Sequence, residues 1–374
     1  MKRRQNGEGT IYQRPNGLWI CEITLGYDEN GKRIKKTVSS MELDKLKKKL
    51  NDLRFYNDRN MVSEPSKITL YEWLNIWLET YKKNTVKPST YDMYYNAIHT
   101  HIKPVLGNYK LDKVTPLAIQ RFINDIYEKK NSSQSTLKKI VMTISQGYEK
   151  AISLNMLYQN PCRDIVIPSK DKRKAVAFTK NEQEEFVNQC SDNNTYNNLF
   201  VFALNTGLRM GELLALTWDD YNENEKTVAV NKNLSVVNDY TNPQDIKQKI
   251  IIDTTKTENS TRIVPLSSKA EEILNRQKTI TGSFPFVFIS SSGTPLEKRN
   301  IYKALKKRLN YAQVKSPITF HSLRHSFATR LLEKGADIKT LSELLGHKSI
   351  QITLDIYSHV GIDLKKKAIE LLNN

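Results

Sequence analysis

The sequence has little that would link it to a secreted, membrane-embedded or zinc-binding protein. Its 374 residues include three cysteines, too few and too far apart for a disulfide framework or a zinc site: Cys21, Cys162 and Cys190. No apolar run approaches the roughly 18 residues that a membrane span needs, and the first residues lack the apolar core of a signal peptide. These absences favour a soluble protein in a reducing cytoplasm, without contact to a membrane.

Nucleotide hydrolysis and two-metal nuclease chemistry also lack their residues. The sequence contains no glycine-rich phosphate loop. It shows no carboxylate cluster of the kind that holds a pair of Mg²⁺ ions. We therefore expect no cofactor and no metal, and a chemistry that side chains carry by themselves.

Positive charge is what the sequence has in excess. The chain contains 58 Lys and Arg against 40 Asp and Glu, a formal net charge of +18. Residues 1–60, 61–172 and 173–374 each contribute +6, so the charge is spread along the chain. Because each phosphate that a cation neutralises releases condensed counterions, this pattern indicates several segments that contact one long polyanion. Composition alone does not say whether this polyanion is DNA, RNA or an acidic membrane, so the choice depends on the motifs.

The first part of the chain, residues 1–62, has strand composition followed by a basic helix. Turn signals at Pro15-Asn16-Gly17 and around Gly31 separate three short strands within residues 1–40. A helix rich in lysine is expected over 41–59. The sequence predicts a small three-stranded sheet plus a helix, which is either a DNA-binding module or a module with a solvated basic face.

The second part, residues 67–166, is predicted to be an all-helical domain. Thr69 and Glu72 have the spacing of a capping box. The residues that follow form an apolar stripe at spacings of three and four, which indicates a helix packed in a core: Leu70, Trp73, Leu74, Trp77, Leu78 and Tyr81. Further helices are expected over about 88–103, 116–129 and 133–154, with prolines between them.

The third part, residues 175–374, is predicted to be mixed and mainly helical, which makes the whole chain a multidomain α+β protein. A helix capped by Thr179 with Glu182 behind it opens this part, and another is expected at about 195–205. A small antiparallel sheet is expected from the short strands 227–233, 249–254 and 261–265. A last helix, over about 362–372, has an apolar stripe that packs either on its own domain or on a neighbouring subunit.

Four clusters between residues 204 and 359 carry the chemistry. Taken singly, each has an ordinary explanation as a helix-surface pair, a solvated turn or a packing residue. They are Thr206-Gly207-Leu208-Arg209-Met210-Gly211-Glu212, with Arg209 at a helix start; Lys256 in a hairpin between two strands; His321-Ser322-Leu323-Arg324-His325 on one helical face; and Leu345-Gly346-His347 followed by Tyr357.

Together the clusters supply what metal-free phosphodiester chemistry needs. Arginine offers fixed paired donors that match the non-bridging oxygens of a phosphate. Tyrosine can attack phosphorus in line where nearby cations favour its phenolate. The leaving 5′ hydroxyl is a poor leaving group, so Lys or His must give it a proton. A buried Arg324 beside two histidines is costly unless it meets an anion.

This ordered set resembles the tyrosine recombinase (phage integrase) family over about residues 179–360. Residues 67–160 also resemble the core-binding domain of that family, and residues 1–60 are similar to the arm-binding domain of integrases from temperate phages and conjugative transposons. The resemblance implies DNA cleavage and rejoining through a 3′-phosphotyrosyl intermediate, without ATP. It implies a homo-tetramer on double-stranded core and arm attachment sites, with an excisionase and a host DNA-bending protein as partners.

The resemblance also implies roles for the residues that contact the phosphate. Tyr357 would be the nucleophile, and Arg209 and Arg324 would hold the non-bridging oxygens. Lys256 would protonate the leaving oxygen. His347 would donate a hydrogen bond to the phosphate.

Two further residues would act beside them. His321 would assist proton transfer at the tyrosine, and Glu212 would orient Arg209 or a neighbouring histidine. Ten positions separate His347 from Tyr357, where many family members have nine. A small bulge before the tyrosine would absorb the extra residue.

Three other functions remain open. A chromosome or plasmid resolution recombinase has the same chemistry but usually lacks an arm domain. A type IB topoisomerase shares the site but needs no assembly helix. A DNA-binding regulator with an inactive site is disfavoured by the complete set of catalytic residue types.

Overall fold

The fold is that of a computed structural model, which describes residues 10–27, 33–57, 68–169, 176–240, 245, 247–254, 261–347 and 349–357. Contacts divide the chain into two compact units, residues 1–172 and 173–374. Helices dominate, and the strands form small antiparallel sheets, so the expected multidomain α+β class is confirmed. Across these described ranges, no helix has the length and apolar character to cross a membrane.

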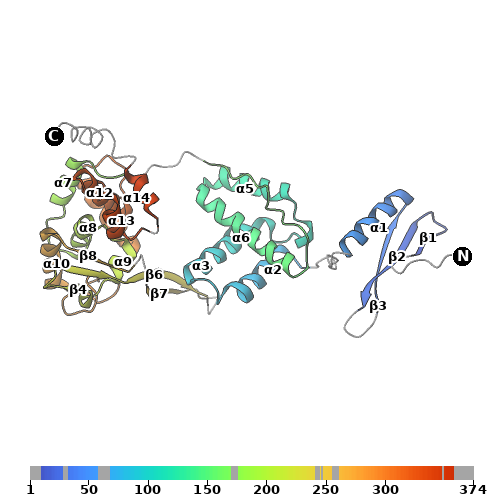
Figure 1. Cartoon of the computed structure of the whole chain (residues 1–374), viewed down its shortest axis with the longest axis horizontal. Helices are drawn as coiled ribbons and strands as arrows, with labels where there is room; N and C mark the ends of the chain where they lie inside the picture. Colours follow the sequence, from blue (N-terminus) through green and yellow to red (C-terminus); the bar gives the residue numbers. More distant parts are fainter. Residues whose placement is uncertain are drawn as a thin grey trace. The chain divides into compact units, whose positions relative to one another are not determined.

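The first described segment is a three-stranded antiparallel sheet with one helix packed beside it (Figure 1). Cys21 and Ile23 of the central strand pack against Leu46 and Leu50 of the helix, and all four side chains are buried. The expected sheet and helix are therefore confirmed. The elements are β1 (Thr10–Gln13), β2 (Trp19–Tyr27), β3 (Arg33–Ser40) and α1 (Leu43–Asn57).

Residues 68–169 are helical, as expected. Thr69 and Glu72 form the predicted capping box, and the indole of Trp73 donates to the carbonyl of Gly147 at 2.9 Å, which fixes the first helix against the last. Two of the expected helices change to π-helical geometry along their length. The elements are α2 (Leu70–Trp77), η1 (Leu78–Lys82), α3 (Pro88–Asn96), η2 (Ala97–Ile102), α4 (Lys103–Leu106), η3 (Leu111–Lys113), α5 (Pro116–Lys130) and α6 (Gln134–Ser153).

The second unit contains two small sheets among its helices. One sheet has the order β4-β5-β8, and β6 and β7 form a long two-stranded ribbon (Figure 1). The elements up to the last strand are α7 (Lys180–Asn188), α8 (Thr195–Thr206), α9 (Met210–Ala215), η4 (Trp218–Asp220), β4 (Tyr221–Asn222), β5 (Thr227–Val230), β6 (Lys232–Asp239), β7 (Lys247–Thr254) and β8 (Arg262–Pro265). The helices after it are α10 (Ser268–Thr281), α11 (Lys298–Tyr311), α12 (Phe320–Glu333), α13 (Ile338–Leu345) and α14 (Ile350–Tyr357).

Two sequence predictions for these strands are wrong. The expected strand 227–233 is divided between β5 and β6, which belong to different sheets. The chain changes sheet there because Asn231 and Lys232 turn toward Asp220, at 3.4 and 2.7 Å. The expected pairing of the strands on either side of Lys256 is also wrong, since among the described strands β7 pairs with β6, and β8 pairs with β5. Lys256 itself lies outside the described residues.

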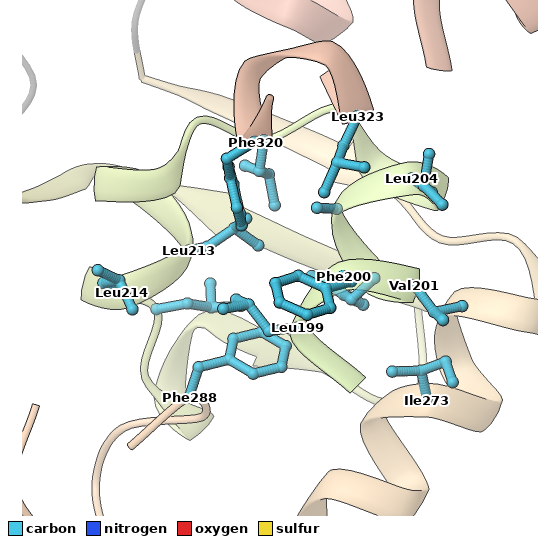
Figure 2. Close-up of a cluster of buried hydrophobic side chains, with 14 of the residues drawn as sticks. Leu199, Phe200, Val201, Leu204, Leu213, Leu214, Ile273, Phe288, Phe320 and Leu323 are labelled. Atoms are coloured by element: carbon cyan, nitrogen blue, oxygen red, sulfur yellow. The ribbon is translucent and has the colours of Figure 1, made fainter. Parts of the chain in front are cut away.

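The core of the second unit surrounds α8, which is buried along most of its length. Figure 2 shows Phe320 and Leu323 from the start of α12, and Leu213 from α9, within the same cluster as Phe200 of α8. The carboxyl end of α8 and the first turns of α9 and α12 therefore share one core. This packing fixes the backbone positions from which the side chains of Arg209 and Arg324 extend.

Gly207 ends α8 in a crowded left-handed conformation. Its φ is +65°, and a Cβ there would lie 2.4 Å from Cδ1 of Phe327 and 2.8 Å from Cδ2 of Leu345. We expect Gly207→Ala to lower the free energy of unfolding, through left-handed strain of about 1–2 kcal/mol and overpacking of about 1–3 kcal/mol. Denaturant unfolding measures the loss.

Gly335→Ala is the matched control for Gly207→Ala. Gly335 has a φ of +89°, but a Cβ added there would have no atom within 4 Å among its described neighbours. It should therefore show the backbone strain without the overpacking. Equal losses for the two variants would contradict the role of packing at Gly207.

Candidate active site

Arg209 lies at the turn between α8 and α9, where it is the residue that caps α9. Its backbone N–H donates to Glu212 at 2.9 Å, and its Nη1 donates to the same carboxylate at 2.7 Å. Nη2 donates to the carbonyl of Gly346 at 2.9 Å. The side chain is still 38% exposed. Both terminal nitrogens of the guanidinium are thus held, while the side chain as a whole stays partly exposed.

Arg324 is buried in the second turn of α12, with 4% of its surface exposed. Its Nη1 donates to the carbonyl of Gly207 at 2.8 Å, and its Nη2 donates to the carbonyl of Leu345 at 2.6 Å. Burial and the nearby charge of Arg209 lower the pKa of Arg324 to about 9, which leaves it protonated at neutral pH. A buried cation held by carbonyl dipoles favours an anion as its next neighbour.

The carboxyl end of α13 joins the two arginines to a third. The carbonyls of Leu344, Leu345 and Gly346 accept hydrogen bonds from three different guanidiniums, those of Arg262, Arg324 and Arg209 respectively. The last carbonyls of a helix have no partner within it, and they form the negative end of its dipole. Three cations therefore gather at one helix end, directly before His347.

Arg262 and Glu212 form a buried ion pair behind Arg209. Their side chains are 7% and 4% exposed, and Nη2 of Arg262 lies 2.9 Å from Oε2 of Glu212. Burial raises the pKa of Glu212, but the hydrogen bond and charge of Arg262, together with Arg209, outweigh it. The net effect holds this pKa below its usual value, so Glu212 is ionised.

The three described histidines of this unit lie close to the guanidiniums. The rings of His321 and His325 pack edge to face with centroids 4.7 Å apart. Nδ1 of His347 lies 2.8 Å from Oγ1 of Thr353, a buried residue of α14. Partial burial and the charges of Arg324 and Arg209 lower the pKa of His321. Burial, followed by neighbouring charged and histidine groups, lowers the pKa of His325 to about 4 and of His347 to about 3.

The lowered pKa values predict a loss of stability in mild acid. A histidine that titrates at about 6.5 when unfolded binds fewer protons in this fold. Stability therefore falls as the pH drops from about 6.5 toward the folded pKa values of about 4 and 3. We expect the double variant His325→Gln/His347→Gln to lose less thermal stability between pH 7 and pH 5 than the unsubstituted protein. Equal losses in the two proteins would contradict these shifts.

The structure brings together most of the residues that the sequence singled out. Arg209, Glu212, Arg324 and His347 meet at the carboxyl end of α13, and His321 lies near enough for Arg324 to affect its pKa. Glu212 was expected to orient either Arg209 or a neighbouring histidine, and its carboxylate accepts a hydrogen bond from Arg209.

Arg262 is a further partner of Glu212 that sequence reasoning missed. It was not a candidate because its partners, Glu212 and Leu344, are 50 and 82 residues away in the sequence. No local spacing or periodicity could have indicated either contact.

Tyr357 is the last residue of α14, and its side chain lies outside the described structure. The backbone is α-helical from Ile350 to Tyr357, so the bulge expected before the tyrosine is not found within this helix. The expected helix 362–372 also lies outside the described residues.

The arrangement can bind an anion. The fixed guanidiniums of Arg209 and the buried Arg324 lie near neutral imidazoles that can donate or accept a hydrogen bond. Within the part of the chain that the structure describes, no three His, Cys, Asp or Glu residues are grouped to hold a metal ion. These residues match the needs of a phosphodiester in transfer.

Comparison with known sequences gives matches along almost the whole chain. A model described as the phage integrase family matches residues 176–362, and one described as the phage integrase N-terminal SAM-like domain matches residues 69–127. A tyrosine recombinase XerC-like protein of Caldanaerobacter subterraneus subsp. tengcongensis is 33% identical, over 94% of this chain and 95% of that protein. The ICEBs1 integrase of Bacillus subtilis is 26% identical, over 98% and 99% of the two chains.

Solved structures show the same fold. The Tn1549 transposon integrase in complex with a circular intermediate DNA has a TM-score of 0.69 and 21% identity, over 82% of this chain and 100% of that one. A lambda integrase dimer bound to a COC′ core site has a TM-score of 0.60 and 20% identity, over 95% and 96% of the two chains. At these identities the likeness concerns the fold alone.

Proposed function

Because the chain belongs to the phage integrase family and is a tyrosine-type site-specific recombinase, we propose that it integrates and excises a mobile genetic element. The full-length match to the ICEBs1 integrase supports this role. We assign arm-site binding to residues 1–62, core-site binding to residues 67–166 and catalysis to residues 175–374. The surplus of positive charge in each part fits contact with a long DNA.

The observation that carries the proposed chemistry is the convergence of guanidiniums on the carboxyl end of α13. Arg324 uses two of its five N–H groups on carbonyls there and at Gly207, and the Arg209 side chain is partly exposed. In the proposed reaction these two arginines hold the non-bridging oxygens of the scissile phosphate. Removing one such donor from a transition state typically costs about 10²–10³-fold in rate.

The proposed cleavage step exchanges one phosphoester bond for another. The hydroxyl oxygen of Tyr357 bonds to phosphorus, and the bond from phosphorus to the 5′ oxygen breaks. His321 assists removal of the tyrosine proton, Lys256 gives a proton to the leaving 5′ oxygen, and His347 donates a hydrogen bond to the phosphate. The bond energy is retained in the phosphotyrosine, so a 5′ hydroxyl of the partner duplex can reverse the step and rejoin the strands.

The proposed assembly is a homo-tetramer that brings two DNA sites together. A lambda integrase of similar fold is known as a tetramer bound to a Holliday junction, and a tetramer would let strands exchange in pairs. We include an excisionase and a host DNA-bending protein as partners, since arm and core sites must be bridged by one chain. The cytoplasm is the proposed place of action, which the three free cysteines fit.

A suicide DNA substrate made from the ends of the element tests the proposed function. A nick next to the scissile phosphate lets the short 5′-hydroxyl product leave, so a covalent protein–DNA adduct should accumulate. Two intact sites should recombine, whereas relaxation of a supercoiled plasmid without recombination would indicate a topoisomerase. The absence of any adduct would support an inactive DNA-binding regulator.

A chromosome or plasmid resolution recombinase is the second candidate, favoured by the 33% identity to a XerC-like protein. The two functions differ in the DNA that they need. A resolution enzyme would recombine two core sites without flanking sequence. The proposed integrase should need the flanking arm sites on at least one partner DNA.

A further inference from the structure

Arg262 is an arginine with a largely covered side chain that connects three elements of the catalytic unit. It is the first residue of β8, and its Nε donates to the carbonyl of Leu344 on α13 at 2.6 Å. Its Nη1 and Nη2 donate to the two carboxylate oxygens of Glu212 on α9, at 3.2 and 2.9 Å. Only 7% of the side chain is exposed, so it is placed to hold other groups and not to contact DNA.

Both partners of Arg262 lie one step from groups with proposed roles in cleavage. Oε1 of Glu212 accepts from Arg262 and also from Nη1 of Arg209, at 2.7 Å. The carbonyl of Leu344 is two residues before that of Gly346, which accepts from Nη2 of Arg209. Glu212 and the Gly346 carbonyl therefore hold the guanidinium of Arg209. Arg262 bonds the first of these directly, and it bonds the same end of α13 as the second.

We propose that Arg262 is a positioning residue for DNA cleavage, which fixes the guanidinium of Arg209 and the His347 end of α13 relative to each other. This inference rests on the proposed function of the site. The planar fork of arginine makes the bidentate bond to Glu212 and the bond to Leu344 at once. A lysine has one point charge on a flexible stem and cannot reproduce all three bonds.

Arg262→Lys in the full-length protein is expected to slow single-turnover adduct formation on the order of 100-fold, because a shift of about 1 Å in a reacting group can have that effect. Binding of the same DNA should change by less than about 3-fold, since Arg262 makes no proposed contact with it. Loss of cleavage without loss of binding supports positioning. A wild-type cleavage rate would overturn it.

Arg330→Lys is the matched control. Arg330 lies on α12 and its side chain is 17% exposed. It bonds the carboxylate of Glu333 and the carbonyl of Phe178, both at 2.6 Å, and the amide oxygen of Gln183 at 3.4 Å. Both variants are compared at a temperature where circular dichroism shows them folded. Arg330→Lys should cleave within about 3-fold of the unsubstituted protein. An equal cleavage defect in both variants would mean that Arg262 has only a structural role.

A double-mutant cycle with Arg209→Ala tests the route of the effect. If Arg262 acts by holding Arg209, then Arg262→Lys should slow adduct formation much less in the Arg209→Ala background than in the unsubstituted protein. The group that Arg262 positions is already gone in that background. Equal costs in both backgrounds would overturn this route.

A substrate with sulfur in place of the bridging 5′ oxygen separates the proposal from a second route. Arg262 follows, in the sequence, the segment 255–260 that contains Lys256. A thiolate leaves without a proton, so the sulfur substrate would restore cleavage if Arg262 acted through Lys256 as proton donor. The cleavage defect should persist with the sulfur substrate if Arg209 is the group positioned.

Failure of the proposed function and failure of the positioning role give different results. If the unsubstituted protein forms no adduct through Tyr357, the proposed function fails. If it forms a normal adduct and the Arg262 variants cleave at the same rate, only the positioning role is refuted.

Discussion

Tyr357→Phe is expected to abolish the covalent adduct with a suicide DNA substrate, with a fall in rate of at least about 10⁴-fold. Phenylalanine keeps the ring but lacks the oxygen that would bond to phosphorus. The residue ends α14, a helix that His347 contacts through the buried Thr353, so the substitution should leave that helix in place. DNA binding, measured by mobility shift, should stay within about 3-fold because the phosphate contacts remain.

Tyr311→Phe is a suitable control for this substitution. Tyr311 is the last residue of α11 and is 55% exposed. Its variant should form the adduct at the rate of the unsubstituted protein. An adduct that persists in Tyr357→Phe would place the nucleophile on another residue and would contradict the proposed reaction.

The features that local sequence decides were predictable. Helix starts are one example, because a capping box depends on hydrogen bonds between residues three apart. The expected starts at Thr69 and Thr179 are both found, with Glu72 and Glu182 completing the boxes. The turn that brings Arg209 to a helix start was predictable for the same reason, since Gly207 gives the chain its left-handed step.

The features that depend on distant partners were not predictable. Residues 227–233 do not form one strand because Asn231 and Lys232 bond Asp220, and the chain passes from one sheet to the other at this point. The pairing of β8 with β5, instead of β7, depends on a sheet built from segments far apart. No periodicity or spacing in the sequence records either choice.

The dependence on distant partners also explains why Arg209 and Arg324 were predicted as site residues but the carbonyls that hold them were not. The sequence places Arg209 and Arg324 in the motifs that carry the family resemblance. It does not show that a helix end 21 residues after Arg324 accepts hydrogen bonds from both, and from Arg262 as well. The geometry of the site therefore depends on α13 as much as on the residues that the motifs contain.

Glu212→Ala is expected to lower the free energy of unfolding of the second unit by about 3–5 kcal/mol, as is typical when one partner of a buried ion pair is removed. The carboxylate is 4% exposed and separates two guanidiniums, those of Arg262 and Arg209. Without it, a buried cation would lose its counter-charge, and two like charges would face each other. Denaturant unfolding followed by circular dichroism measures the loss.

The pH dependence and two further variants show whether charge causes this loss. The pKa of Glu212 is held below its usual value, so its stabilisation is present above the unfolded pKa of about 4.3 and disappears as the pH falls through the folded one. The difference in free energy of unfolding between Glu212→Ala and the unsubstituted protein should therefore shrink in acid.

Adding Arg262→Met to Glu212→Ala should recover part of the stability, because the unpaired buried cation is then removed. Glu343→Ala, at an exposed position of α13, should change stability by less than about 0.5 kcal/mol; an equal effect of Glu212→Ala would show that the buried pair does not stabilise the unit.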